Sequence, residues 1–594
     1  MPFDGSATGR GRWLEGLRRL VPFNQWHPPT AERLRADLGA GAAVALVLIP
    51  QSMAYAALAG MPPHYGLYAA FLPVMVAAIW GSLPQLACGP VAITGLLTAS
   101  ALTPLAEPGS GEYVALAITL ALMAGALQLA LGLFSLGTLV NFLAHPVILG
   151  FTNAAAIVIA LSQLNDLLGV PMASDTGILI AVAEVLGRLP QAHLPTLAFG
   201  VAAMAIIAAC RRWLPRVPGV LAAAAGLTPL SYLVGLEDMG GEVVGTIPAG
   251  LPPLSLPSLS WDEVTTLFSS AVVVALVGFI EAISIAKAIA ARTRARIDPN
   301  QELVGQGLGN LAAGLSQAFP ISASFSRSAI NHSTGARTGM ASVFTALIVA
   351  LTLLLLTPLL YHLPVAVLAA IIIMAVSSLV DIEAMRQTWR THRQDGAVAL
   401  TTFIASLALA PHLDYGILLG GVLAIVLYLL RTMRPRVVIL SRHPADGTLR
   451  DARRFGLPES RHIAALRFDG PLYFANVGHL EDAVLAINHE YPEARFVLLV
   501  GDGITSVDSS GAETLHNLDE RLRDNGVTLV LAGVKLQVME VLERAGVAEA
   551  IGRENIFRNE DEAIRAIHGR VDTPDFDAAR CPLLPHTSPY YDGA

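Results

Sequence analysis

Phe319-Pro-Ile-Ser-Ala-Ser-Phe-Ser-Arg-Ser-Ala-Ile-Asn331 is a polar stretch within a long apolar region, and it decides the fold. It carries four serines, one arginine (Arg327) and Pro320, a residue that lacks a backbone donor and disfavours helix just before it. We therefore expect a break at Pro320 and a short helix that starts near Ser322. Hydrocarbon does not solvate free backbone groups or a guanidinium, so the segment should be buried in protein or line a wet cavity.

The start of this short helix predicts an anion site. Serine caps are expected there, and the free N–H groups of the first turn would point into the gap. The positive end of the helix dipole and an arginine together attract an anion. The structural alternative is a kinked membrane helix in which the serines bond one another and Arg327 reaches the membrane interface.

The composition predicts a polytopic membrane protein. Of the 594 residues 54% are hydrophobic and only 14% are charged, whereas soluble domains are about a quarter charged. No Asp, Glu, Lys or Arg occurs from Leu38 to Ala106, while the chain from about Arg431 has the composition of a soluble domain. The net charge of −8 argues against a nucleic-acid partner, and three scattered cysteines predict neither a metal site nor a disulfide framework.

Fourteen apolar segments are predicted to cross the membrane. A spanning helix needs about 20 apolar residues, and several segments are shorter or interrupted by Gly and Pro, as is typical of transporter helices broken at the midplane. The segments lie at about 40–58, 64–82, 88–104, 113–134, 138–165, 177–210, 218–236, 264–291, 301–318, 322–333, 339–360, 364–380, 396–411 and 414–431. The predicted regions are a cytoplasmic amphipathic segment (1–37), a transmembrane domain (38–432), an α/β domain (436–567) and a disordered tail (568–594).

The distribution of arginines agrees with this number of spans. With fourteen spans, the basic clusters fall in the N-terminal segment, the even-numbered loops and the start of the C-terminal domain, and the other loops carry acids. We expect both termini on the cytoplasmic side of a plasma (inner) membrane. The basic N-terminal segment is expected to lie on the lipid surface, and a frayed tail is the alternative.

A weak internal repeat relates two interrupted helices. The third segment begins with Cys88-Gly-Pro-Val-Ala92, and the tenth begins at Pro320. If segments 1–7 and 8–14 are the two halves, both interrupted helices are third in their half, and an odd number of spans inverts one half. We therefore expect a 7+7 inverted repeat in which two half-helix N-termini face one pocket near the midplane.

Three further polar residues lie within predicted membrane segments. Gln51 and Tyr55 follow Pro50 and share one helical face, so they are expected to face either the substrate or a packing partner. Glu281 lies inside the eighth segment, where a carboxylate is costly unless it is paired or wet. Such a residue often carries a coupling proton or cation, and an ion pair with Arg327 or Lys287 is the structural alternative.

Several of these stretches together resemble the SulP anion transporters, the prokaryotic relatives of the solute-carrier-26 anion exchangers. They cover most of the membrane region in the right order, and only their combination is specific. The matching stretches are Ile49–Gly60, Pro62–Tyr68, Cys88–Ala92, Asp298–Glu302 and Phe319–Asn331.

The resemblance implies a seven-plus-seven fold in which a core domain moves against a gate domain, usually in a homodimer. It implies a substrate site between the N-termini of the third and tenth helices. Residues of the first helix also line this site, and the eighth helix carries an acidic residue. Carried over to this sequence, the substrate residues are Gln51, Tyr55, Pro90, Val91, Ala92, Ser324, Phe325, Ser326 and Arg327, and the coupling acid is Glu281. This sequence has Ala323 where many relatives carry Gly.

The C-terminal region alternates predicted strands and helices and so forms a small α/β layer. The strands are expected at Ile463–Phe468, Phe496–Val500 and Val527–Ala532, and the helices at Leu480–Glu490, Gly511–Asp524 and Val534–Ala545. The region is similar to a STAS domain, the module shared with anti-sigma-factor antagonists, through Val507-Asp-Ser-Ser-Gly511.

This STAS motif places Asp508, Ser509 and Ser510 at a helix N-terminus, where a phosphate would be stabilised. The three residues are therefore regulatory candidates. A plain helix cap is the alternative, and the domain is also expected to serve dimer contacts or a cytoplasmic protein partner.

We expect a secondary active transporter of a small inorganic oxyanion, with sulfate favoured, that is coupled to H⁺ or Na⁺ through Glu281. Bicarbonate or a C4-dicarboxylate is the alternative substrate. An anion channel or exchanger, or a membrane-tethered signalling receptor, is the alternative function. The expected partners are the anion, membrane lipid and a second copy of the chain. Apart from the coupling ion no cofactor is expected, and no nucleophile–base arrangement suggests an enzyme.

Overall fold

The computed structural model describes residues 30–137, 144–170, 178–214, 217–255, 260–410, 413–572, 576–577 and 581–584. Most of the predicted N-terminal segment (1–29) and the end of the predicted tail (585–594) lie outside these described residues. The chain divides into two compact units, Met1–Ala424 and Ile425–Ala594.

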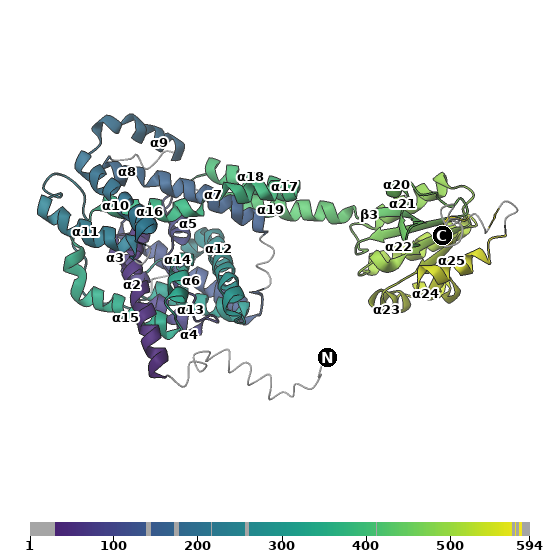
Figure 1. Cartoon of the computed structure of the whole chain (residues 1–594), viewed down its shortest axis with the longest axis horizontal. Helices are drawn as coiled ribbons and strands as arrows, with labels where there is room; N and C mark the ends of the chain where they lie inside the picture. Colours follow the sequence, from purple (N-terminus) through teal and green to yellow (C-terminus); the bar gives the residue numbers. More distant parts are fainter. Residues whose placement is uncertain are drawn as a thin grey trace. The chain divides into compact units, whose positions relative to one another are not determined.

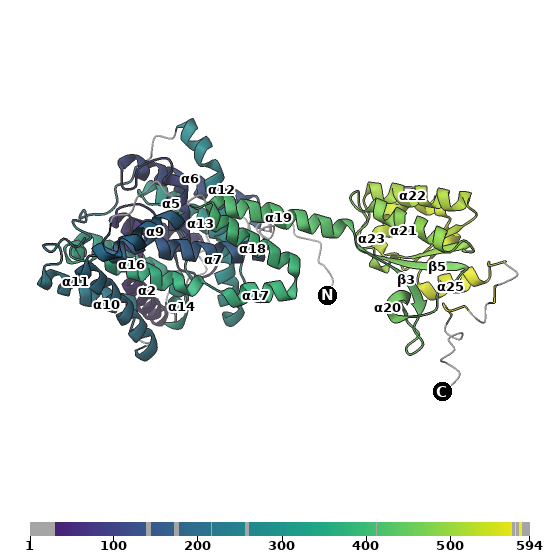
Figure 2. The same ribbon diagram turned by 90° about the horizontal axis from the view of Figure 1, so that it is seen from above.

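The first unit is built almost entirely from helices (Figures 1 and 2). Its first half contains α2 (Ala31–Leu58), α3 (His64–Ala69), α4 (Leu72–Trp80), α5 (Ala92–Leu102), α6 (Gly111–Leu133), α7 (His145–Ser162), α8 (Leu164–Leu168), α9 (Ile178–Gly187), α10 (Leu194–Trp213) and α11 (Gly219–Val234). Its second half contains α12 (Trp261–Thr293), α13 (Pro299–Leu315), α14 (Phe325–Ser333), α15 (Met340–Leu351), α16 (Val365–Val376), α17 (Ile382–Thr391) and α18 (Arg393–Ala408), and α19 (Leu413–Met433) runs on into the second unit.

The lengths of these helices fit a protein that spans a membrane several times. Among the described residues, seven helices are at least 18 residues long and apolar enough to cross a bilayer, and four shorter apolar helices accompany them. The predicted polytopic helical class is therefore confirmed. The fourteen individual spans remain a prediction.

Helix α13 lies against α6 and α4 at very short range. A methyl group added at Gly307 of α13 would lie 2.5 Å from the backbone nitrogen of Leu129 in α6. A methyl group at Gly305 would lie 2.7 Å from the backbone nitrogen of Gly81, directly after α4. Such close backbone approach through small residues is typical of membrane helices. It holds α13, which precedes the interrupted segment, firmly against its neighbours.

Two very short strands join the halves of this unit. β1 (Cys88–Gly89) pairs antiparallel with β2 (Ser322–Ala323), and Cys88 lies opposite Ala323. Each strand leads almost directly into a short helix, β1 into α5 and β2 into α14. The helix predicted to start near Ser322 in fact begins at Phe325, because Ser322 and Ala323 are extended and pair with β1.

The second unit contains a six-stranded sheet with the strand order β4-β3-β5-β6-β7-β8. β5, β6, β7 and β8 are parallel, and β3 is antiparallel to both of its neighbours. The strands are β3 (Arg436–Arg442), β4 (Leu449–Asp451), β5 (Ile463–Asp469), β6 (Phe496–Val500), β7 (Thr528–Ala532) and β8 (Ile556–Phe557). The helices are α20 (Ala452–Phe455), α21 (Val477–Glu490), α22 (Ser509–Asp524), α23 (Leu536–Arg544), α24 (Val547–Ile551) and α25 (Glu560–His568).

Both faces of this sheet are covered. α21, α22, α23 and α24 supply apolar side chains to one face, and α25 supplies them to the other. The three predicted strands and three predicted helices are all present, with ends that shift by a few residues. The α/β class of this region is therefore confirmed.

One part of the predicted disordered tail belongs to the core of this unit. Cys581 is 3% exposed and Leu583 is fully buried, and both pack on the sheet face that α25 covers. The Nε group of Arg442 donates to the carbonyl of Leu583 at 2.7 Å. The prediction of disorder is wrong for residues 581–584. Burial of the apolar side chains of Cys581 and Leu583 stabilises this segment against the sheet.

Candidate functional site

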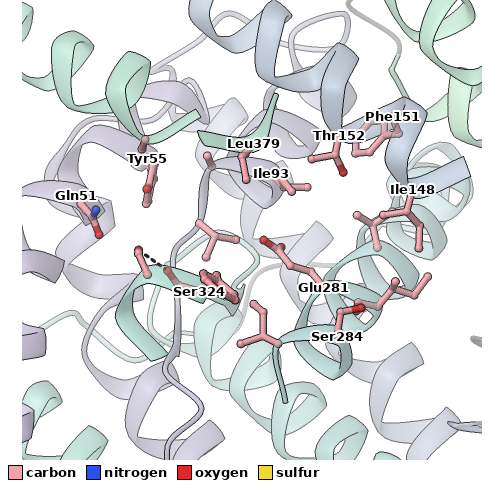
Figure 3. A pocket seen from close by; sticks show the side chains of 18 of the residues that line it. Gln51, Tyr55, Ile93, Ile148, Phe151, Thr152, Glu281, Ser284, Ser324 and Leu379 are labelled. Carbon is pink, nitrogen blue, oxygen red and sulfur yellow. Dashed lines mark hydrogen bonds between the residues drawn. The ribbon is translucent and has the colours of Figure 1, made fainter. Parts of the chain in front are cut away.

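A cavity of about 680 Å³ lies in the membrane unit and brings together most of the predicted site residues (Figure 3). Its wall includes Gln51, Tyr55, Val91, Ala92, Glu281, Ser324, Phe325 and Ser326. Pro90 and Arg327 are not among its lining residues. Figure 3 shows Gln51 and Tyr55 on one side of the space, with Ile148, Phe151 and Thr152 on the other.

The first turns of α5 and α14 both border the cavity. Val91 precedes α5 without a capping hydrogen bond, whereas the Ser324 hydroxyl caps α14 by accepting from the backbone N–H of Arg327 at 3.5 Å. The hydroxyls of Ser324 and Ser326 are 3.3 Å apart, the contact drawn as a dashed line in Figure 3. The first N–H groups of a helix have no partner within the helix, so both helices offer donors and positive dipole ends.

Gln51 and Tyr55 reach the same space from α2. They lie one helical turn apart, as the sequence predicted, and both are almost completely buried. The Oε1 atom of Gln51 has no hydrogen-bond partner among the described residues. The amide and the phenol therefore add polar groups, including donors, to a wall that otherwise contains apolar side chains.

Arg327 lies behind the cavity wall. Its side chain is fully buried, and its three guanidinium nitrogens have no hydrogen-bond partner among the described residues. A methyl group added at Gly89 would lie 3.3 Å from Nη2 of Arg327, so the guanidinium reaches strand β1. Direct contact between Arg327 and the substrate stays a prediction. Successive helical residues are about 100° apart, and the turn that directs Ser324 and Ser326 to the cavity directs Arg327 into the protein.

The structure separates the two alternatives for Arg327. Its side chain is fully buried and does not reach an interface. It forms no hydrogen bond with Glu281 or Lys287, but its charge and that of Glu281 attract each other. An unpaired buried cation is costly, and its field acts over a longer range in a low dielectric than in water. We therefore expect the charge of Arg327 to favour an anion at the two helix N-termini.

A polar network holds the segment before α14 in place. The Asn310 side chain accepts from the N–H of Ile321 at 2.7 Å and donates to the Ile321 carbonyl at 3.2 Å and to Gln128 Oε1 at 2.8 Å. The Ser322 hydroxyl donates to the carbonyl of Gly278 at 2.8 Å. These bonds satisfy backbone groups at the break, which need partners when they are buried.

The segment before α5 is held by α14 itself. The N–H of Ala87 donates to the Ser328 hydroxyl at 2.9 Å, and the Ala87 carbonyl accepts from the N–H of Ser324 at 3.0 Å. Together with the pairing of β1 and β2, these bonds make one connected structure of the two half-helix starts.

Comparison with known proteins agrees with this arrangement. Residues 34–402 match the Sulfate permease family, and residues 455–563 match the STAS domain. The chain belongs to the sulfate permease family. It is 34% identical to "Sulfate transporter 4.1, chloroplastic" of Arabidopsis thaliana, with 95% of this chain and 86% of that protein covered. It is 32% identical to "Probable sulfate transporter MT1781" of Mycobacterium tuberculosis, with 94% and 98% covered.

A solved structure of SLC26A9 has the same fold. The two structures superpose with a TM-score of 0.88 over 95% of each chain, at 22% sequence identity. The predicted family and the combination of a membrane domain with a STAS domain are therefore confirmed.

In this member of the sulfate permease family, Glu281 lines the cavity from α12. Its Oε2 atom is buried and has no hydrogen-bond partner among the described residues. A carboxylate in such a place is available for a proton or a cation. Its coupling role remains a prediction.

Several other lining residues were not predicted from the sequence. They are Phe151 and Thr152 of α7, Met374 of α16, Ile417 of α19 and Leu379, which follows α16. Apolar side chains in a membrane helix carry no signal that separates a cavity wall from a lipid-facing surface. Arg211 and His145 also line the cavity. The charge of Arg211 and the imidazole ring of His145 are the sequence features that could have pointed to these two residues.

The regulatory candidates of the second unit lie at the start of α22. Asp508 caps this helix by accepting from the N–H of Gly511 at 2.8 Å, and its other oxygen accepts from the N–H of Phe474 at 3.0 Å. Ser509 is exposed and Ser510 is partly exposed. The capping alternative is thus realised by Asp508, and phosphorylation of either serine remains a prediction.

Proposed function

We propose that this protein is a secondary active transporter, not an enzyme, that carries a small inorganic oxyanion, sulfate, by alternating access. The supporting observation is a single cavity that receives the first turns of α5 and α14, with the buried cation of Arg327 behind them. Helix N-termini and a nearby cation favour an anion, and the serine hydroxyls add donors. Relatives named as sulfate transporters along almost the whole chain support sulfate as the substrate.

Glu281 is proposed to couple anion movement to protons or sodium. An anion and a coupling cation that share one cavity compensate each other's charge, so each improves the affinity for the other. The unpaired carboxylate oxygen of Glu281 supports this role. Movement of the wall that contains α7 and α16 against the half-helices would then open the cavity to the other side.

The remaining assignments follow from the family and the charge distribution. We place the protein in a plasma (inner) membrane with both termini in the cytoplasm, because the basic clusters lie in alternate loops. A homodimer and a cytoplasmic protein partner at the STAS domain are proposed as the roles of the second unit.

Uptake into liposomes tests substrate and coupling together. The purified protein would be reconstituted, and uptake of labelled sulfate, bicarbonate and succinate would be measured with a proton gradient, a sodium gradient or neither. We expect gradient-driven sulfate uptake that is lost in Glu281→Gln, because the neutral amide binds neither a proton nor sodium in the same way.

The other outcomes have distinct meanings. Gradient-driven uptake of bicarbonate or succinate in place of sulfate would change the substrate and leave the mechanism standing. Sulfate uptake that ignores both gradients and the Glu281→Gln change would contradict coupling and identify an exchanger or a channel.

A further inference from the structure

The cavity wall contains one cationic side chain that has no role in the proposed function. Arg211, in the last turn of α10, is the only Lys or Arg among the described residues that line the cavity. No hydrogen bond or ion pair of its guanidinium is found within the described part of the chain. Its charge is therefore available to an incoming anion.

Arg211 is an exposed part of the cavity wall. Its side chain is exposed, as is that of His145, a second lining residue at the start of α7. At the start of α14, Ser324 is only 8% exposed and Arg327 is fully buried, whereas Phe325 and Ser326 are exposed. An anion in the cavity therefore meets an exposed guanidinium on its wall in addition to the two half-helices.

We infer that Arg211 is a recruiting cation, a residue that attracts the anion into the cavity by long-range electrostatics and raises its affinity for the inner site. This inference rests on the proposed function. A charge at the mouth of a cavity with low-dielectric walls concentrates ions of the opposite sign inside it. The attraction between an exposed charge and a ligand weakens as salt screens it, whereas direct contacts in a buried site are screened much less.

A helix-stabilising role is the structural alternative, and the chain provides a control for it. Arg211 and Arg212 both lie in the last turn of α10, where a cation interacts favourably with the negative end of the helix dipole. Both side chains are exposed, but only Arg211 lines the cavity. Arg212→Gln thus removes the same charge from the same helical turn and leaves the cavity wall intact.

The orientation follows from the proposed topology. The basic cluster at the end of α10 belongs to a loop that is expected on the cytoplasmic side. The part of the cavity wall that contains Arg211 is then near the cytoplasmic side, and Arg211 acts on the anion in the inward-open state. An equilibrium binding measurement on detergent-solubilised protein does not depend on orientation and suits this test.

The experiment measures equilibrium binding of labelled sulfate to the purified full-length protein. It compares the wild type, Arg211→Gln, Arg211→Lys and Arg212→Gln. Ionic strength is set with sodium gluconate at about 20 mM and about 300 mM, where the Debye length falls from about 20 Å to about 6 Å. Thermal unfolding of each variant confirms that it is folded.

At low ionic strength we expect Arg211→Gln to weaken sulfate affinity by about fivefold to tenfold, as the loss of one charge near a dianion predicts. At high ionic strength the difference should nearly disappear. Arg211→Lys keeps the charge and should bind like the wild type, as should Arg212→Gln. Equal affinities of Arg211→Gln and Arg212→Gln would overturn the inference.

Two further results would also overturn it. A loss of affinity in Arg211→Gln that is equal at both ionic strengths would assign Arg211 to direct contact instead of recruitment. A wild-type protein that binds no sulfate under either condition would overturn the proposed function and this inference with it.

Discussion

The helices α5 and α14 enter the cavity in the same way and carry different chemistry. Both follow a two-residue strand, and the two strands pair with each other. α5 starts with Val91 and Ala92 and has no side-chain cap, whereas α14 has a serine cap and carries a second serine and Arg327 in its first turn. The two half-helix starts thus contribute similar backbone dipoles, and only the start of α14 adds polar side chains to them.

This difference separates two contributions to anion binding, attraction by charge and directional hydrogen bonding. A helix N-terminus attracts any small anion, because N–H groups and the dipole recognise charge and not shape. Hydroxyl groups in defined positions add directional hydrogen bonds. We therefore expect generic attraction to be shared by both half-helices and discrimination between anions to be concentrated at α14.

The largest expected effect comes from removing the buried charge behind α14. Arg327→Met should reduce sulfate uptake on the order of 100-fold, since interactions of a buried charged group are worth about 3 kcal/mol. Its thermal stability without substrate should not fall, because an unpaired buried cation is itself destabilising. Liposome uptake and thermal unfolding check the two statements, and Arg327→Lys is the charge-conserving control. Normal uptake by Arg327→Met would refute the role of this charge.

A smaller effect is expected at the strand pair. Gly89 has a φ of +147°, and a methyl group there would lie 3.2 Å from Val74 Cγ2 and 3.3 Å from the Arg327 guanidinium. Gly89→Ala should therefore destabilise the protein by about 1–3 kcal/mol and lower uptake, since it strains the backbone and displaces Arg327.

The matched change on the other strand is Ala323→Gly. Ala323 is fully buried and has an ordinary backbone conformation, so the loss of its methyl group should cost only about 1 kcal/mol. Thermal unfolding measures both variants. Equal destabilisation by the two would show that the strands are not distinguished by backbone strain.

The smallest effect is expected from exchanging the caps. Ser324→Ala removes the cap of α14 and a cavity hydroxyl, and should weaken sulfate binding by about fivefold, in line with about 1 kcal/mol for a cap. Val91→Ser adds a hydroxyl at the start of α5 and should strengthen binding by about twofold. Equilibrium binding is the suitable measurement, because Val91 also buries apolar surface whose loss lowers stability. Unchanged affinity in both variants would place the anion away from these two N-termini.

Much of the site was predictable because polar residues are conspicuous in an apolar chain. Ser324 and Ser326, which follow the break at Pro320, and the pair Gln51 and Tyr55 all line the cavity. The direction of Arg327 was not predictable, since it depends on where α14 begins. That start was predicted too early, because a two-residue strand has no periodicity that a sequence pattern can reveal.

In the second unit, too, long strands were predicted from the sequence and a two-residue strand was missed. The buried strands β5, β6 and β7 are continuous apolar runs between turn residues, which made them easy to predict. β8 has only two residues and was missed for the same reason as β2. Residues 581–584 were assigned to a disordered tail because the prolines around them outweighed Cys581 and Leu583.

These last residues affect how the domain should be produced for study. A chain shortened to end at position 563, where the STAS match stops, would cut α25 and remove both Cys581 and Leu583. The sheet face formed by Val438, Leu440 and Ile463 would then lose much of its cover and be left open to water. An exposed apolar face of this kind causes self-association. An isolated domain should therefore extend at least to residue 584, and an affinity tag belongs beyond that point.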